Sequence, residues 1–147
     1  MITYLSLGSN LGDREHNLDL AVELLSQRVG HVLRRSSIYK SKSWGYVSEN
    51  DYFNICVSLE TSLSPLELLS ATQEIERDLG RTHKTVNSQY HDRTIDIDIL
   101  IYSPEPINLN NLEQLPYDQQ INLPNLTIPH PLMTQRDFVL IPLKQII

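Results

Sequence analysis

The chain is organised around the stretch Arg93-Thr94-Ile95-Asp96-Ile97-Asp98-Ile99-Leu100-Ile101, in which apolar and polar residues alternate as in a β-strand. In a strand, the four isoleucines share one face, and Asp96 and Asp98 share the other, about 7 Å apart. Carboxylates this close repel each other, and Mg²⁺ sites commonly combine one or two carboxylates with phosphate oxygens and water. Arg93 precedes the strand, placed for a phosphate. Aspartates also occur on solvated strand faces, so the motif alone leaves both a metal site and a plain wet face open.

Length, composition and charge indicate which classes of protein the sequence can belong to. With 147 residues, 40% hydrophobic and 20% charged, the sequence predicts one globular domain over residues 1–147. The formal net charge of −6 argues against a nucleic-acid-binding surface. The single cysteine, Cys56, excludes an intrachain disulfide and a cysteine-rich zinc site. No basic leader and no apolar run of membrane-spanning length is present, so we expect a cytoplasmic protein without a membrane partner.

Two periodicities divide the chain into strands and helices. Runs rich in β-forming residues predict strands at residues 2–7, 31–40, 52–61 and 93–101. Helical spacing predicts helices at residues 18–29 and 64–80 and a last one within 133–147. The order β-α-β-β-α-β predicts an α+β, ferredoxin-like fold, with an antiparallel sheet, helices packed on one face and an added C-terminal helix. The face with the aspartates is then expected to be free of helices.

Short motifs mark the ends of these elements. Ser64-Pro65-Leu66-Glu67 is typical of a capping box, and Gly30 fits a helix C-cap. Gly8-Ser9-Asn10-Leu11-Gly12 joins the first strand to the first helix; it either cradles phosphate or is a plain turn, and we favour the plain turn. The polar loop at residues 81–92 is either a solvated loop or an anion lid. Residues 104–126 form a long excursion, rich in Pro, Asn and Gln, that we interpret as an insertion.

Several separated motifs agree in order and spacing with one known family. They are Gly8-Ser9-Asn10, Tyr52-Phe53-Asn54, Gly80-Arg81, Arg93-Thr94-Ile95-Asp96-Ile97-Asp98, Pro129-His130 and Arg136-Asp137-Phe138. Nearly end to end, the chain resembles the 6-hydroxymethyl-7,8-dihydropterin pyrophosphokinases. The resemblance implies transfer of pyrophosphate from ATP to the pterin hydroxymethyl group, giving AMP and the pterin diphosphate in folate biosynthesis.

The resemblance also implies roles for individual residues. Two Mg²⁺ ions would be held by Asp96 and Asp98 and bridge the phosphates of ATP, the co-substrate. The catalytic positions are Arg81, Arg93, Asp96 and Asp98. The pterin positions, including two aromatic rings that would sandwich the pterin, are Ser41, Lys42, Trp44, Tyr52, Asn54 and Phe138. The ATP positions are Gln73, Glu76, Lys84, Tyr90, Arg93, Ile99, Thr127, His130 and Arg136. Residues 81–92 would then be a catalytic loop.

Two other classes of function remain open from the residues themselves. A palm-type nucleotidyltransferase also places carboxylates on a ferredoxin-like sheet, but it needs a basic groove for template or primer. A non-catalytic ferredoxin-like module that binds nucleic acid or another partner needs exposed aromatic residues with basic neighbours on the sheet, where this chain carries acids. We therefore expect a monomer whose partners are ATP and 6-hydroxymethyl-dihydropterin, with no nucleic acid.

Overall fold

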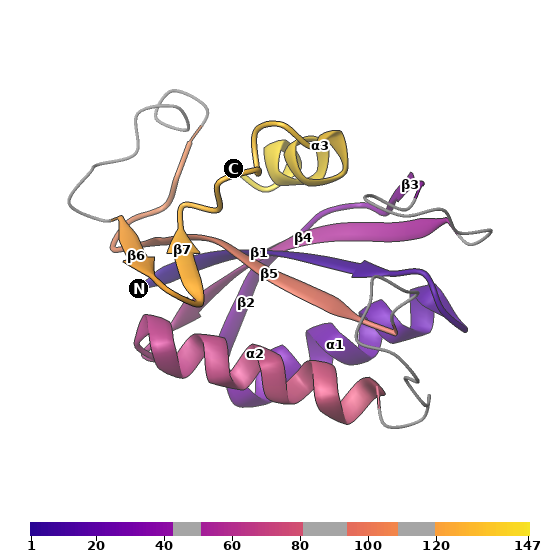
Figure 1. The fold of residues 1–147 in the computed structure, drawn as a ribbon, viewed down its shortest axis with the longest axis horizontal. Helices are drawn as coiled ribbons and strands as arrows, with labels where there is room; N and C mark the ends of the chain where they lie inside the picture. The colour runs from indigo at the N-terminus through magenta and orange to yellow at the C-terminus, as the bar shows by residue number, and fades with distance from the viewer. Residues whose placement is uncertain (43–50, 81–93, 109–119) are drawn as a thin grey trace.

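The structure, a computed structural model, describes residues 1–42, 51–80, 94–108 and 120–147. Helices and strands follow one another along the chain as shown in Figure 1. In order they are β1 (Ile2–Ser9), α1 (Arg14–Arg28), β2 (Gly30–Arg35), β3 (Tyr39–Ser41), β4 (Tyr52–Thr61), α2 (Pro65–Gly80), β5 (Asp96–Ser103), β6 (Ile121–Leu123), β7 (Leu126–Ile128) and α3 (Asp137–Gln145). The predicted strand at 52–61 is confirmed to the residue as β4.

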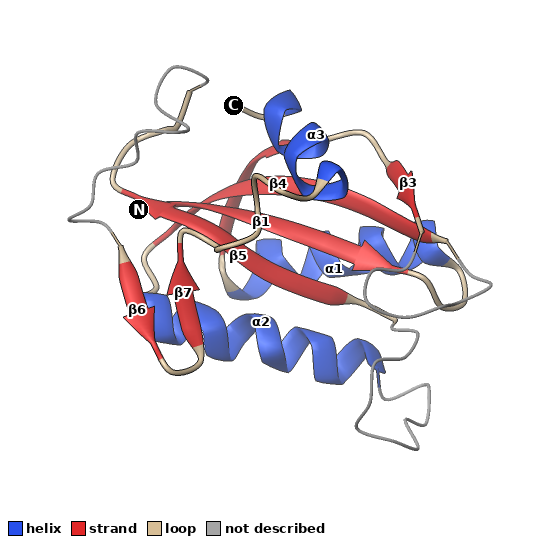
Figure 2. Cartoon of the chain, turned by 45° about the horizontal axis from the view of Figure 1, so that its top comes forward, coloured by secondary structure: helices blue, strands red, loops and turns tan. Residues whose placement is uncertain are grey.

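The main sheet has the order β2-β4-β1-β5, and β3 also pairs with β4. All of these pairings are antiparallel. Helices α1 and α2 cover one face of this sheet, whereas α3 lies over the other face (Figures 1 and 2). The expectation of a helix-free second face is therefore wrong, because α3 folds back onto it. A separate hairpin, β6-β7, lies at residues 121–128, at the end of the predicted excursion.

Apolar side chains pack on both faces of the sheet, in two separate clusters. The larger cluster joins inward residues such as Leu7 and Ile55 to helix residues such as Leu18 and Leu68. The smaller cluster joins the other sheet face to α3. Each fully buried Leu or Ile side chain contributes roughly 1.5–3 kcal/mol to folding. Burial raises the pKa of Cys56, in the smaller cluster, to about 12, despite a hydrogen bond with Ser6, so this thiol is a neutral core group.

A β-bulge in β5 reverses which side chains of its second half point to each face of the sheet. Tyr4 pairs with Ile101 but Leu5 pairs with Ile99, so Leu100 is an extra residue in β5. Beyond this point the alternation is shifted by one position. Ile101 therefore belongs to the smaller cluster under α3, while Ile99 belongs to the larger one. The prediction that all four isoleucines share one face is wrong for Ile101.

Local signals explain the helix boundaries. The capping box is confirmed, because Ser64 N donates to Glu67 Oε1 (2.9 Å) and Glu67 N donates to Ser64 Oγ (3.2 Å). Gly30, in contrast, is not a C-cap with left-handed backbone; it is the first residue of β2. A Cβ at Gly30 would lie 1.9 Å from the carbonyl oxygen of Glu60, so glycine is required here by the close approach of β4.

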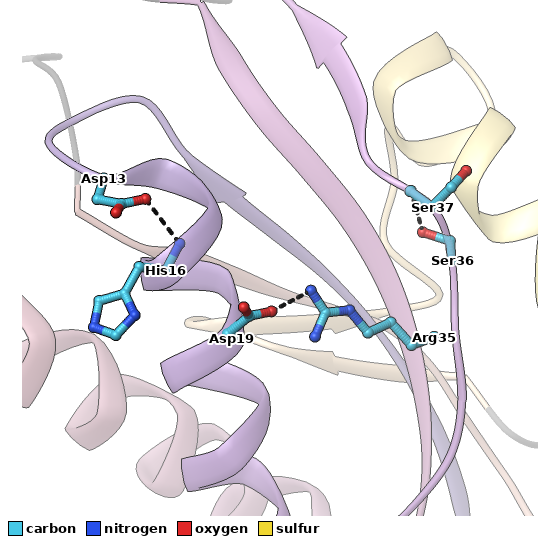
Figure 3. A network of polar contacts seen from close by, with 6 residues as sticks. All are labelled: Asp13, His16, Asp19, Arg35, Ser36 and Ser37. Atoms are coloured by element: carbon cyan, nitrogen blue, oxygen red, sulfur yellow. Dashed lines mark hydrogen bonds and ion pairs between the residues drawn. The ribbon is translucent and has the colours of Figure 1, made fainter.

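The predicted strand at residues 31–40 is divided into β2 and β3. The side chain of Ser36 causes this division, because its Oγ accepts a hydrogen bond from Cys56 N (2.9 Å) while Ser36 N donates to Cys56 O (2.9 Å). The Ser36 hydroxyl also donates to the carbonyl of Ser37 (2.9 Å), which Figure 3 shows beside α3. In the described parts of the chain, no helix is long and apolar enough to cross a bilayer.

Candidate active site

Two cross-strand rows form the floor of the candidate site, on the sheet face opposite α1 and α2. In the first row, Asn54 of β4 and Asp96 of β5 flank Gly8 of β1. In the second row, Cys56 and Asp98 flank Ser6 in the same way. Side chains opposite one another in a sheet point to the same face, so both aspartates share a face with Asn54. The predicted pairing of Asp96 and Asp98 on one half-buried strand face is confirmed.

Gly8 is the member of the first row that has no side chain, and its neighbours on β4 lie close to its backbone. A Cβ at this position would lie 3.2 Å from Asn54 Oδ1 and 3.2 Å from Tyr52 Cδ1. The Tyr52 ring and the Asn54 amide of β4 thus lie over the backbone of Gly8. The row consequently has a ring and an amide at one end, a carboxylate at the other, and no side chain between them. In the sequence, Gly8 appears only as part of a turn and of the Gly8-Ser9-Asn10 motif, because the strand pairing that places it between Asn54 and Asp96 is not visible in one strand.

The side-chain amide nitrogen of Asn54 donates hydrogen bonds to two residues of β3. Its Nδ2 donates to the carbonyl of Tyr39 (2.9 Å) and to Ser41 Oγ (2.8 Å), and the side chain is buried. Asn54 therefore connects the predicted pterin residue Ser41 to the floor of the site. With both amide hydrogens used in this way, the oxygen Oδ1, which lies near Gly8, is the atom that can accept from a ligand.

His130 joins the segment after β7 to the edge strand β5. Its backbone N–H donates to the carbonyl of Leu100 (2.9 Å), and its Nδ1 accepts from Leu132 N (3.2 Å). Burial lowers the pKa of His130, the charge of Arg136 lowers it further, and Asp96 opposes both. The imidazole is therefore neutral at pH 7, with its proton on Nε2 as a donor.

The start of α3 supplies the remaining described groups. Arg136 is the N-cap residue of α3, and its guanidinium carbon lies 5.6 Å from the centroid of the Phe138 ring. Phe138 is half-buried against the smaller apolar cluster. Asp96 and Arg136 each act electrostatically on the pKa of His130, in opposite directions. The structure thus brings together predicted residues from β5, from the β7–α3 segment and from α3.

Other predicted site residues are less closely grouped. Gln73 is exposed and Glu76 half-buried on α2, which covers the opposite face of the sheet. Thr127 and Lys42 are exposed, and the Ile99 side chain is in the larger apolar cluster, so only its main chain is available to a nucleotide. The predicted residues that lie outside the described parts of the chain are Trp44, Arg81, Lys84, Tyr90 and Arg93.

The donor set fits a metal ion that arrives with its substrate. Within the described residues, no group of three or more His, Cys, Asp or Glu side chains could hold a metal by itself. Asp96 and Asp98 offer only carboxylate oxygens, and Mg²⁺ prefers six oxygen ligands. Two carboxylates leave most of that coordination shell to water and to phosphate oxygens. These two carboxylates therefore fit a divalent metal ion whose remaining ligands are water and phosphate oxygens.

Comparisons with known proteins show which family the chain is similar to. Residues 4–147 match the family model described as 7,8-dihydro-6-hydroxymethylpterin-pyrophosphokinase. The chain is 46% identical over 145 residues to the 2-amino-4-hydroxy-6-hydroxymethyldihydropteridine pyrophosphokinase of Porphyromonas gingivalis, covering 99% of this chain and 90% of that protein. It is 41% identical to the Bacillus subtilis protein of the same name, covering 99% of this chain and 77% of that one.

Solved structures show the same fold at much lower identity. A Plasmodium falciparum HPPK-DHPS crystal structure superposes with a TM-score of 0.64 at 18% identity, over 95% of this chain and 38% of that one. The family assignment therefore rests on the sequence comparisons, whereas the solved structures support the fold alone. The chain belongs to the 7,8-dihydro-6-hydroxymethylpterin-pyrophosphokinase family.

Proposed function

We propose that this protein transfers pyrophosphate from ATP to the hydroxymethyl group of 6-hydroxymethyl-7,8-dihydropterin, giving AMP and the pterin diphosphate, a step of folate biosynthesis. The observation that carries this proposal is the row Asn54–Gly8–Asp96. It places a ring-and-amide end suited to a flat heterocycle in line with a carboxylate end suited to metal and phosphate. Because Gly8 has no side chain, the Tyr52 ring and Asn54 Oδ1 lie close over its backbone, between β4 and the carboxylate of Asp96.

The pterin end of the site is built from aromatic and amide groups. Tyr52 and Phe138 are both half-buried and supply the two rings, and stacking on each contributes about 0.5–1.5 kcal/mol beyond burial. Asn54 Oδ1 accepts from a pterin N–H, while its Nδ2 keeps Ser41 in place. Lys42 and Trp44 complete this end of the site. Alignment of the hydroxymethyl group then lowers the barrier by fixing its direction of attack.

The nucleotide end is built from charged groups and one neutral donor. Asp96 and Asp98 hold two Mg²⁺ ions, whose chemistry is to neutralise and orient the phosphate oxygens. Neutral His130 donates from Nε2, and Arg136 contributes a fixed positive charge. ATP also contacts Gln73, Glu76, Ile99, Thr127, Lys84 and Tyr90. Arg81, in a catalytic loop at residues 81–92, and Arg93, the residue after that loop, neutralise the outer phosphates.

The finer features of the fold and assembly are part of the same proposal. The order β2-β4-β1-β5 supports a ferredoxin-like topology, to which α3 is added within one domain. Residues 104–126 are an insertion. Among the described residues, the exposed large apolar side chains, such as Leu33, Leu66 and Ile141, lie on different elements, which supports a monomer. Use of ATP as co-substrate supports a cytoplasmic location.

Product analysis tests the function. The purified protein is incubated with ATP, Mg²⁺ and 6-hydroxymethyl-7,8-dihydropterin, and nucleotides and pterins are separated by chromatography. AMP and pterin diphosphate should appear in equal amounts, and neither should form without the pterin. ADP with a pterin monophosphate, or nucleotide consumption that does not depend on pterin, would contradict the proposal.

A further inference from the structure

The turn between β1 and α1 has no part in the site described so far, although it is tightly held. Asn17 Nδ2 donates to the carbonyl of Leu11 (2.8 Å) and to Ser9 Oγ (3.2 Å). Gly12 has φ 71°, in the left-handed region that favours glycine. The Asp13 carboxylate accepts from His16 N (3.1 Å) and caps α1, as Figure 3 shows. These contacts fix the first helical residue, Arg14.

Arg14 reaches from this turn to the start of β4. Its Nη1 donates to the carbonyl oxygen of Asp51 (2.7 Å), and its guanidinium carbon lies 4.2 Å from the centroid of the Phe53 ring. Lys40 Nζ lies 5.2 Å from the same centroid. Arg14 therefore contacts the residues on both sides of Tyr52, one through its main chain and the other through its ring.

Tyr52 and Phe53 point to opposite faces of the sheet. Phe53 packs against the larger cluster, beneath α1 and α2, whereas the Tyr52 ring lies beside Gly8 on the site face. Fixing residues 51 and 53 from the helix side consequently fixes the backbone that carries the Tyr52 ring. Arginine suits this task, since its planar guanidinium can donate a hydrogen bond and stack on a ring at the same time.

We propose that Arg14 is a positioning residue for the pterin-binding end of the site, acting from the opposite face of the sheet through Asp51 and Phe53. The turn between β1 and α1, with Arg14 at its end, is then an anchor for the acceptor-binding strand and not a phosphate cradle. This inference rests on the proposed function, and it predicts a defect confined to the pterin.

The test compares Arg14→Met with Arg35→Met. Arg35 also bridges α1 to a strand, donating to Asp19 Oδ1 (2.7 Å), but it contacts no site residue in the described chain. Arg14→Met should raise the KM for pterin about threefold to tenfold, with the KM for ATP and kcat changed by less than about twofold. Arg35→Met should leave all three within about twofold. Arg14→Lys keeps the charge but not the planar group, and it should show a smaller rise in the same KM.

A double-mutant cycle with Phe53→Leu separates an effect of Arg14 through the Phe53 ring from an overall loss of stability. If Arg14 acts partly through Phe53, Arg14→Met should raise the KM for pterin by a smaller factor in the Phe53→Leu background than in the wild type, and the remaining rise is the part that acts through the Asp51 carbonyl. An unchanged KM for pterin, or equal rises in both KM values, in Arg14→Met would overturn the inference; if that variant does not fold, the same readings on Arg14→Lys decide. A wild-type protein that forms no pterin-dependent AMP would instead overturn the proposed function, so the two failures are distinguishable.

Discussion

The two faces of the central sheet use alternate residues of the same strands for different purposes. On the face under α1 and α2, Leu5 and Leu7 of β1 are fully buried in a continuous apolar cluster. On the other face, the intervening residues Ser6 and Gly8 lie in rows that end at Asp98 and Asp96. α3 closes only part of that face with apolar contacts. Period-two geometry thus lets one strand supply stability to one side and leave the other side for binding.

The largest expected effect comes from the acidic face. Asp96→Asn and Asp98→Asn should each reduce kcat by orders of magnitude, because each removes one of the two carboxylates proposed to hold the metal. The free energy of unfolding should stay the same or rise slightly without metal, since removing one charge relieves repulsion. Steady-state kinetics at saturating Mg²⁺ with denaturant unfolding checks both effects. Near-wild-type turnover in either variant would exclude the metal assignment.

The helix-covered face should respond in the opposite way. Leu7→Ala removes a fully buried side chain between Ser6 and Gly8, and it should lower the free energy of unfolding by about 2–5 kcal/mol. The kcat per folded molecule should change far less than in the aspartate variants, because the Leu7 side chain lies on the other face. Urea unfolding and active-site-normalised assays at low temperature measure the two quantities. Loss of turnover without loss of stability would mean that the two faces are not functionally separate.

Within the site face, the aromatic end should be separable from the acidic end. Tyr52→Ala and Phe138→Ala should each weaken pterin binding by about 1–3 kcal/mol, through lost stacking and burial, with little change in ATP binding. Isothermal calorimetry with each ligand provides the measurement. Equal losses for pterin and ATP would indicate that these rings act only as packing residues.

The smallest effect concerns pH. Burial and the Arg136 charge lower the pKa of His130 from its ordinary value of 6.5, so the unfolded chain binds this proton more readily than the folded one. This residue therefore reduces stability as the pH falls through 6.5 toward the lowered value. In His130→Gln, the free energy of unfolding should decrease less between about pH 7.5 and pH 5 than in the wild type. A steeper decrease in the variant would contradict this environment for the imidazole.

The sequence predicted local features well where a single segment determines them. β4 follows from its own run of β-forming residues, and the start of α2 follows from the side chains of Ser64 and Glu67. The bulge at Leu100 could not be foreseen, because it depends on the register between β5 and β1. The division of the strand at Ser36 depends likewise on a hydrogen bond to Cys56, twenty positions away.

The site was predictable as a set of residue types but not as an arrangement. Alternation in β5 placed Asp96 and Asp98 on one face without knowledge of their neighbours. The row through Gly8, the use of the Asn54 amide by β3, and the contact of Arg14 with Phe53 all arise from pairing between distant segments. Nothing in a single strand encodes which residue will lie opposite it.

The central claim, that the two ends of this site join pterin to the two outer phosphates of ATP, is tested most directly by following the β-phosphorus. The protein is incubated with Mg²⁺, 6-hydroxymethyl-7,8-dihydropterin and ATP labelled with ³²P at the β position, and the products are separated. The label should appear in the pterin product, AMP should be unlabelled, and Asp96→Asn should abolish the transfer. Label retained in ADP, with an unlabelled pterin product, would contradict it.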